Sequence, residues 1–168
     1  MKSKQYRNKQ YIDHLRNFGY MQGIDRSSRV KSTQEIFTPL AACEYYCSTL
    51  TDYSNAFTDV TEKIIDNCSG DGEWLGACLI KRLENGFSLE ESLLTLFGSD
   101  LQEDNIKLCH DRLLCGQEDL RDIVKKNIVC ADALRYHYRF DESLPYDPLP
   151  LSKLDQNKLR LRQLGILK

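Results

Sequence analysis

The sequence has 168 residues, of which 41% are hydrophobic and 29% are charged, and its formal net charge is −2. This length suits one domain with a single core, and the composition is ordinary for a globular protein. No apolar run approaches the roughly 20 residues of a membrane span, and the basic start lacks the apolar stretch of a signal peptide, so we expect a cytoplasmic protein with no membrane partner.

The N-terminal segment, residues 1–31, is basic, with eight Lys/Arg against two Asp/Glu. Within it, Tyr11, Leu15 and Phe18 recur near helical spacing, which predicts a helix between residues 6 and 20. This pattern makes the segment partly helical.

A second helix is predicted to begin at Thr38-Pro39, because threonine is a good N-cap and proline suits the first helical position. Apolar residues then recur near helical spacing, which predicts a stripe that faces the core. The stripe consists of Leu40, Cys43, Tyr46, Cys47 and Leu50.

Beyond residue 60, predicted strands and helices alternate. The elements are a strand over 63–66, a helix over 73–83, a short helix opened by the capping box Ser88 and Glu91, a strand from 95 that ends at Asp100, a helix over 103–114, a short helix over 118–125 and a strand over 127–131. This alternation predicts an α/β fold, a parallel sheet of about three strands flanked by helices. We expect this domain to span residues 32–140.

We expect residues 141–168 to form a proline-rich linker and a basic C-terminal tail. The last 17 residues hold five Lys/Arg and one Asp, which leaves a charge of −12 on the middle of the chain. Two basic ends can contact the phosphates of DNA. Solvated termini explain the same pattern, and both interpretations stay open.

The seven cysteines are an odd number and lie in apolar surroundings. Without a secretory signal they are expected to be reduced thiols, several of them small core residues. Their spacing matches no zinc module, so we expect no metal site.

Each of the three predicted strands ends in an acidic residue, and the first also leads into a glycine-rich turn. These residues are Asp66 with Gly70 and Gly72, then Asp100, then Asp132. Ligands of open α/β sheets bind at the carboxyl ends of the strands. The two glycines allow close approach of the backbone to a ligand, and the helix that follows favours an anionic group. An ordinary turn and helix N-caps explain each residue singly.

Four segments in this order resemble the motifs of S-adenosylmethionine-dependent DNA adenine-N6 methyltransferases, in the style of phage-encoded enzymes. They are Glu35-Ile36-Phe37-Thr38-Pro39, then residues 65–75 with Ser69-Gly70-Asp71-Gly72, then Gly98-Ser99-Asp100-Leu101 through Leu108, and finally residues 127–134 with Asp132-Ala133-Leu134. The resemblance implies a partial Rossmann-like class I methyltransferase fold with a helical N-terminal segment. It also implies S-adenosylmethionine as the cofactor.

In that family the Phe-Thr-Pro segment covers the cofactor, the acidic residue of the second motif holds the ribose, and the aspartate of the third faces the adenine. Carried onto this sequence, the resemblance implies cofactor contacts at Phe37, Thr38, Asp66, Cys68, Gly70, Gly72, Asp100, Leu101, Asp132 and Ala133. Asn67 stands where the family has proline, and Trp74 where phenylalanine is common.

The family's catalytic motif, Asn/Asp-Pro-Pro-Tyr/Phe after a fourth strand, has no counterpart here. Asp147-Pro148-Leu149-Pro150 follows no apolar strand and precedes no aromatic residue. We therefore expect a shortened methyltransferase with no catalytic residue of its own, in which a second copy or a partner subunit completes the sheet beside the exposed backbone of Ile64 and Ile65.

Two other functions stay open. The first is a non-catalytic, degenerate methylase that binds the cofactor, DNA or a host protein. The second is a stand-alone enzyme on a smaller substrate that uses His137, Tyr146 or Asp147, although no predicted strand positions these side chains.

Overall fold

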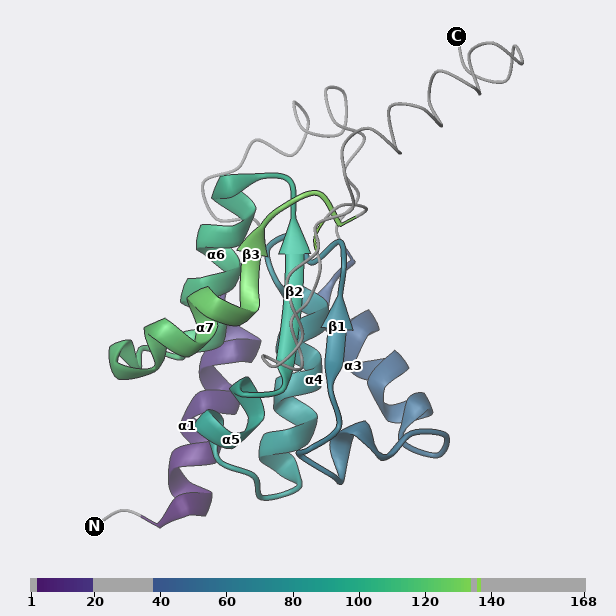
Figure 1. The fold of residues 1–168 in the computed structure, drawn as a ribbon. Coiled ribbons are helices and arrows are strands. Elements are labelled where there is room, and N and C mark those ends of the chain that lie inside the picture. Colours follow the sequence, from purple (N-terminus) through teal and green to yellow (C-terminus); the bar gives the residue numbers. More distant parts are fainter. Residues whose placement is uncertain (1–2, 20–37, 134–135, 137–168) are drawn as a thin grey trace, which may run out of the picture. The chain divides into compact units, whose positions relative to one another are not determined.

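The computed structural model describes residues 3–19, 38–133 and 136 (Figure 1). The chain divides into two units, Met1–Cys130 and Ala131–Lys168. The first unit contains the helices α1 (Lys4–Asn17), α3 (Leu40–Leu50), α4 (Glu73–Glu84), α5 (Leu89–Leu93), α6 (Glu103–Leu114) and α7 (Arg121–Asn127), the 3-10 helices η1 (Asn55–Phe57) and η2 (Glu118–Leu120), and the strands β1 (Ile64–Asp66), β2 (Leu96–Asp100) and β3 (Ile128–Cys130). In the part of the chain that the structure describes, no helix combines the length and the apolar character of a membrane span.

The three strands form one parallel sheet in the order β1-β2-β3, which confirms the predicted α/β fold. Asp66 at the end of β1 is in register with Gly98, and Asp100 at the end of β2 with Cys130. Parallel strands need crossover connections, and the helices α4 and α6 supply them. Within the described sheet, β1 is an edge strand.

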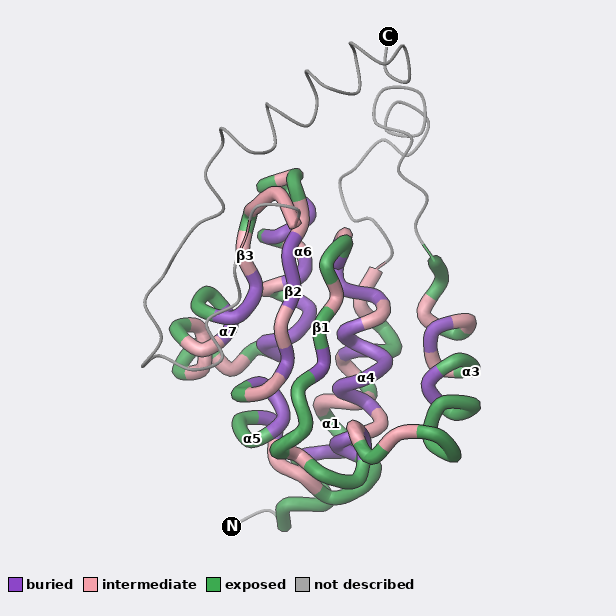
Figure 2. Tube along the Cα trace, turned by 45° about the vertical axis from the view of Figure 1, so that its right-hand side comes forward, coloured by how far each residue is buried: buried purple, intermediate pink, exposed green. Residues whose placement is uncertain are grey.

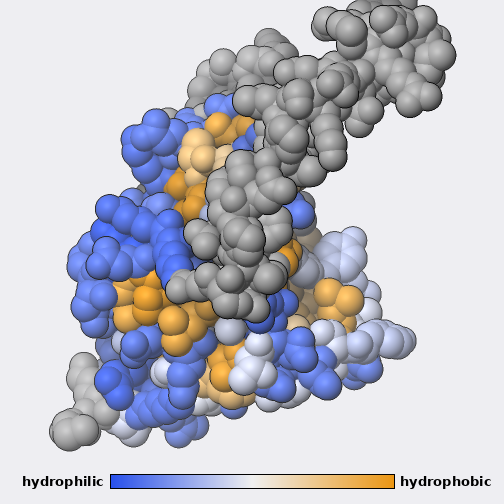
Figure 3. All heavy atoms as spheres, viewed as in Figure 1, coloured by the Kyte–Doolittle hydropathy of each residue, from blue (hydrophilic) through white to orange (hydrophobic). Residues whose placement is uncertain are grey.

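The two faces of the sheet differ in burial. Ile64, Leu96 and Ile128 are buried on the face that α4 covers. Gly98 shows how close that packing is, because an added Cβ would lie 2.8 Å from Cδ1 of Leu75 on α4. Successive side chains of a strand alternate between faces, so the opposite face carries Ile65, Phe97 and Val129. Figure 3, viewed from the same side as Figure 1, shows apolar residues among hydrophilic ones beside the strands.

The N-terminal helix α1 belongs to the core of the first unit. Its Leu15 is fully buried, and Nδ2 of Asn8 donates hydrogen bonds to the carbonyls of Leu83, at 2.9 Å, and Phe87, at 2.7 Å. Asn8 thereby connects α1 to the end of α4 and to the loop that follows it.

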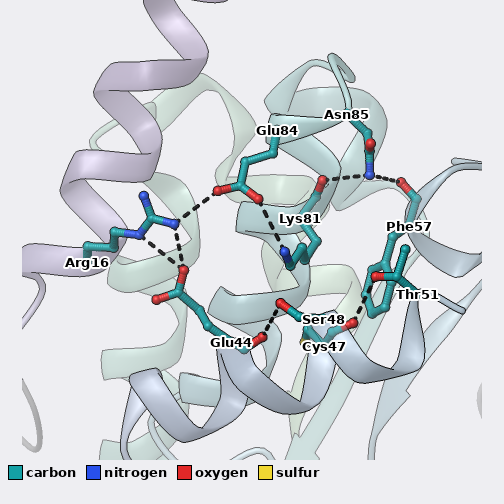
Figure 4. A network of polar contacts seen from close by, with 9 residues as sticks. All are labelled: Arg16, Glu44, Cys47, Ser48, Thr51, Phe57, Lys81, Glu84 and Asn85. Carbon is teal, nitrogen blue, oxygen red and sulfur yellow. Dashed lines mark hydrogen bonds and ion pairs between the residues drawn. The ribbon is translucent and has the colours of Figure 1, made fainter.

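Polar side chains link α1, α3 and α4 at the surface (Figure 4). Arg16 on α1 pairs with Glu44 on α3, at 2.7 Å, and with Glu84 on α4, at 3.0 Å. Such partly exposed pairs stabilise a fold by no more than about 1 kcal/mol. The burial of Leu15 is therefore the stronger reason for the position of α1.

The predicted apolar stripe of α3 is only partly correct. Cys43 and Cys47 are buried, whereas Tyr46 and Leu50 are exposed. At 3.6 residues per turn, Tyr46 lies about 60° around the helix from Cys43, and Leu50 is the last helical residue. Figure 2 shows that buried and exposed residues alternate along α3. The helix also begins one residue later than predicted, since Pro39 is its N-cap.

Most other predicted boundaries are close to the observed ones. The capping box is present, because Ser88 and Glu91 exchange both hydrogen bonds at the start of α5. The short helix predicted over 118–125 is divided into η2 and α7. Asn127, predicted as the first residue of a strand, instead ends α7 and donates a hydrogen bond of 2.9 Å to the carbonyl of Leu93.

Candidate functional site

The candidate site lies at the carboxyl ends of β1 and β2, where the connection from β1 to α4 turns back (Figure 1). We call residues 67–72 the glycine turn. Asp66 directly precedes it, and Asp100 ends the neighbouring strand. The structure thus brings Asp66, Gly70, Gly72 and Asp100 together at one end of the sheet, as predicted.

Both glycines of the turn adopt a backbone conformation that other residues rarely take. The φ angles of Gly70 and Gly72 are 52° and 87°, in the left-handed region. Gly72 is also in close contact with α6, because an added Cβ would lie 2.6 Å from Sγ of Cys109. A side chain at Gly72 would therefore force α4 and α6 apart.

The first half of the turn is fixed to the ends of both strands by its backbone N–H groups. The N–H of Cys68 donates to Oδ1 of Asp66 at 3.0 Å, and the N–H of Ser69 donates to the carbonyl of Ser99 at 3.0 Å. The side chain of Ser99 donates in turn to the carbonyl of Asn67 at 3.3 Å. The ends of β1 and β2 thus hold the turn between them.

Asp100 continues this attachment through its carboxylate. Its Oδ2 accepts the N–H of Gly70 at 3.1 Å, and its Oδ1 accepts the N–H of Gln102 at 2.8 Å and Nδ2 of Asn105 at 3.1 Å. A carboxylate has about four acceptor positions. These three bonds leave about one position for a ligand.

The use of these N–H groups limits which ligands suit the turn. A phosphate is usually bound by several backbone N–H groups at a glycine-rich turn before a helix. Here the N–H groups of Cys68, Ser69 and Gly70 already bind protein acceptors, and that of Gly72 donates to the carbonyl of Ser69 at 2.8 Å. The turn therefore suits a ligand that offers hydrogen-bond donors better than it suits a phosphate.

The acidic residues at the strand ends also disfavour a phosphate ligand. Burial raises the pKa of Asp66, the N–H of Cys68 lowers it, and the nearby charge of Asp100 raises it further. Both groups are acidic, and a positively charged ligand would offset the repulsion between their carboxylates. The site is electrostatically suited to a positively charged ligand.

The buried side of the turn contains a residue that sequence reasoning missed. Arg112 on α6 is fully buried and pairs with Asp71, at 3.0 Å, and with Glu73, at 2.8 Å. Burial raises the pKa of Glu73 in spite of the opposing effect of the arginine. The only signal in the sequence is a cationic residue three positions after Cys109, on the side of α6 that faces the core.

Thr38 is described and Phe37 lies outside the described residues. Thr38 is exposed just before α3, and its carbonyl accepts a hydrogen bond from Sγ of Cys43 at 3.8 Å. Burial raises the pKa of Cys43 to about 11, and the charge of Glu73 contributes.

Cys68 and Leu101 are both exposed next to the site, and Leu101 has 67% of its surface accessible. Asp132 and Ala133 belong to the second unit, in which the carbonyl of Asp132 accepts the N–H of Tyr136 at 2.9 Å. Their predicted contact with an adenine stays a prediction. His137, Tyr146 and Asp147 lie outside the described residues.

Among the described residues, no three His, Cys, Asp or Glu side chains are arranged to hold a metal ion. All seven cysteines are free thiols, and five of them are buried. No protein-family model matches the chain, and no curated protein or solved structure matches it significantly.

Proposed function

We propose that this protein binds S-adenosylmethionine at the carboxyl ends of β1 and β2, as a relative of the DNA adenine-N6 methyltransferases. The observation that carries the proposal is the joint placement of Asp66, the glycine turn and Asp100 at adjacent strand ends. These are the positions that the sequence motifs assign to the cofactor.

The chemistry of the site supports this ligand over a nucleotide phosphate. S-adenosylmethionine offers ribose hydroxyls, which suit the remaining acceptor position of Asp100, and a positive sulfonium, which two nearby carboxylates attract. A dinucleotide would place phosphates beside these carboxylates and find the N–H groups of the turn already bonded.

Methyl transfer to DNA requires a group that binds and activates the target base. The sequence holds no Asn/Asp-Pro-Pro-Tyr/Phe motif. In this proposal a partner subunit supplies that motif, and it adds a strand beside β1, the edge of the described sheet.

One observation favours a second function, a non-catalytic binding module of the same ancestry. The carboxylate of Asp100 accepts three hydrogen bonds, from Gly70, Gln102 and Asn105, so it already has a role in stabilising the fold. This module binds the cofactor, DNA or a host protein without methyl transfer, and in the form that uses no cofactor the partner binds elsewhere on the surface.

A thermal-shift titration distinguishes the two functions. A ligand at 100 times its dissociation constant adds about 2.7 kcal/mol to stability, which at this size raises the midpoint by about 5–10 °C. We expect that shift with S-adenosylmethionine and none with NAD. In Asp100→Asn, affinity should fall about tenfold, which halves the added stability at the same ligand concentration.

The matched control is Asp119→Asn, since Asp119 is an exposed carboxylate on η2. The thermal midpoint of this variant should rise with S-adenosylmethionine as much as that of the wild type. A well-folded wild type whose midpoint does not respond to S-adenosylmethionine would exclude cofactor binding and leave the binding module. A shift with NAD alone would indicate a dinucleotide site.

A further inference from the structure

The side of the glycine turn that faces the core is held by one arginine. Nε of Arg112 donates to the carbonyl of Asp71 at 2.9 Å, and Nη2 donates to the carboxylates of Asp71 and Glu73 at 3.0 and 2.8 Å. The guanidinium therefore binds the main chain of the turn and both acidic side chains around Gly72. None of its surface is accessible to solvent.

Residues on α4 and just after α1 shape the space for this side chain. Gly76 on α4 leaves room for it, because an added Cβ would lie 3.3 Å from Cδ of Arg112. Just after the end of α1, the ring of Phe18 stacks on the guanidinium, with the Arg112 carbon Cζ 4.6 Å from the ring centre. A planar guanidinium fits this arrangement, whereas a lysine ammonium lacks the fork of donors.

The opposite side of the turn faces the strand ends. There Gly70 and Ser69 are bonded to Asp100 and Ser99, so the turn is held from two sides. Gly70 and Gly72 have a left-handed backbone conformation, and glycine has the largest conformational freedom of all residues. Both residues can therefore adopt other conformations when the bonds on either side of the turn are absent. The bonds of Arg112 on the core side therefore determine how often the turn has the described shape.

We propose that Arg112 is a positioning residue: it fixes the glycine turn in the shape that binds the ligand, and so sets ligand affinity without touching the ligand. The proposal rests on the proposed function for the identity of the ligand. Without the fork of Arg112, only a fraction of the molecules has the binding-competent turn. The apparent affinity falls by that fraction.

The experiment uses Arg112→Lys, which keeps the buried positive charge and removes the fork. Its control is Arg121→Lys, because Arg121 pairs with Glu118 and Asp111 on the surface, away from the turn. If Arg112→Lys does not fold, the pair Arg112→Met with Glu73→Gln replaces it, since this pair removes one charge of each sign together.

Two quantities are measured on each variant, at a temperature where it is fully folded. The first is the dissociation constant of S-adenosylmethionine, by calorimetry and by the emission of Trp74, the single tryptophan, which follows Glu73. The second is the hydrogen-exchange rate of the Gly70 and Gly72 amides compared with that of Leu79 in the buried part of α4. Exchange at the turn reports its shape without any ligand.

We expect Arg112→Lys to weaken binding at least tenfold and to speed exchange at Gly70 and Gly72 at least tenfold, with Leu79 unchanged. Arg121→Lys should change neither. Wild-type affinity with wild-type exchange at the turn would overturn the proposal, and so would equal acceleration at Leu79, which signals a loss of global stability alone. If the wild type binds no S-adenosylmethionine, the proposed function fails, and the exchange rates alone decide whether Arg112 positions the turn.

Discussion

The backbone N–H of Gly70 donates a hydrogen bond to the Asp100 carboxylate at 3.1 Å, across a sequence separation of 30 residues. This bond joins the turn after β1 to the end of β2, and it makes one aspartate both a structural anchor and the strongest candidate for a ligand contact. Substitutions at this end of the sheet must therefore be judged by stability and by binding together.

Gly72→Ala should destabilise the protein by about 3–4 kcal/mol. A left-handed φ costs a residue with a side chain about 1–2 kcal/mol, and the new methyl group overlaps Sγ of Cys109, at 2.6 Å. Urea denaturation measures the change.

The control for Gly72→Ala is Gly86→Ala. Gly86 has a similar φ of 89°, but an added Cβ would meet no atom within 4 Å, so only about 1 kcal/mol should be lost. Adding Cys109→Ala to Gly72→Ala should make the double variant about 1–2 kcal/mol more stable than additivity predicts. Equal losses for the two glycine variants would show that the contact with Cys109 contributes nothing.

Glu73 should make stability fall as the pH rises. Burial raises the pKa of Glu73 in the folded state above its ordinary 4.5, so the folded protein holds this proton more tightly than the unfolded chain does. The contribution is complete below about pH 4.5 and is lost as the pH rises through the folded pKa. The stability of the wild type relative to Glu73→Gln should therefore decrease from pH 4 to pH 7 in denaturant titrations.

Glu91 should show the opposite slope, which provides an internal control. The Ser88 hydroxyl and N–H hold the pKa of Glu91 down to about 2, with a further contribution from Lys4. Its contribution is present above about pH 4.5 and is lost as the pH falls through about 2. Parallel profiles for Glu73→Gln and Glu91→Gln would contradict the assigned environments.

Two of the seven thiols should react rapidly with N-ethylmaleimide in the folded protein. Cys68 and Cys130 are exposed, whereas the other five are buried, and burial raises the pKa of Cys115 to about 12. Because the thiolate is the nucleophile, buried thiols react slowly. Intact mass measured over time should show two fast additions, and one in Cys68→Ser. A third fast addition would mean that the core opens readily.

The exposed edge of β1 predicts self-association at micromolar concentration. Ile65 has 40% of its surface exposed, and among the described strands β1 pairs only with β2, which leaves its other edge without a described partner strand. Ile65→Lys places a charge at this edge and should shift the protein toward a monomer in light scattering. Thr61→Lys, on an exposed turn before β1, is the matched control. A monomeric wild type would show that the edge is covered.

The helices and strands around the site were predictable because strong local sequence signals mark where they begin and end. Gly72 and Gly116 delimit α4 and α6, and the apolar runs of β1 and β2 end in an aspartate. A short apolar strand between a turn and a helix has few alternative interpretations. The order of Asp66 and Asp100 at neighbouring ends then follows from the parallel sheet.

The buried arginines were not predictable in the same way. Arg82 and Arg112 are both fully buried, although a charged residue in an amphipathic helix usually faces solvent. Nη1 of Arg82 donates to the carbonyl of Ser92 at 3.0 Å, and its Nε donates to the carbonyl of Ala56 at 2.9 Å. These partners lie in other segments of the chain, so they have no signature in the sequence around each arginine.

The connection between Arg112 and Asp71 spans 41 residues, which has a consequence for the order of events during synthesis. A ribosome releases β1, the turn and α4 well before Arg112 has left the exit tunnel, since domains emerge from the N-terminus. Until then the turn lacks its anchor, because this contact can form only once both ends of the intervening loop are available. A nascent chain arrested before Arg112 would therefore contain both Gly70 and Gly72 and still have no formed site.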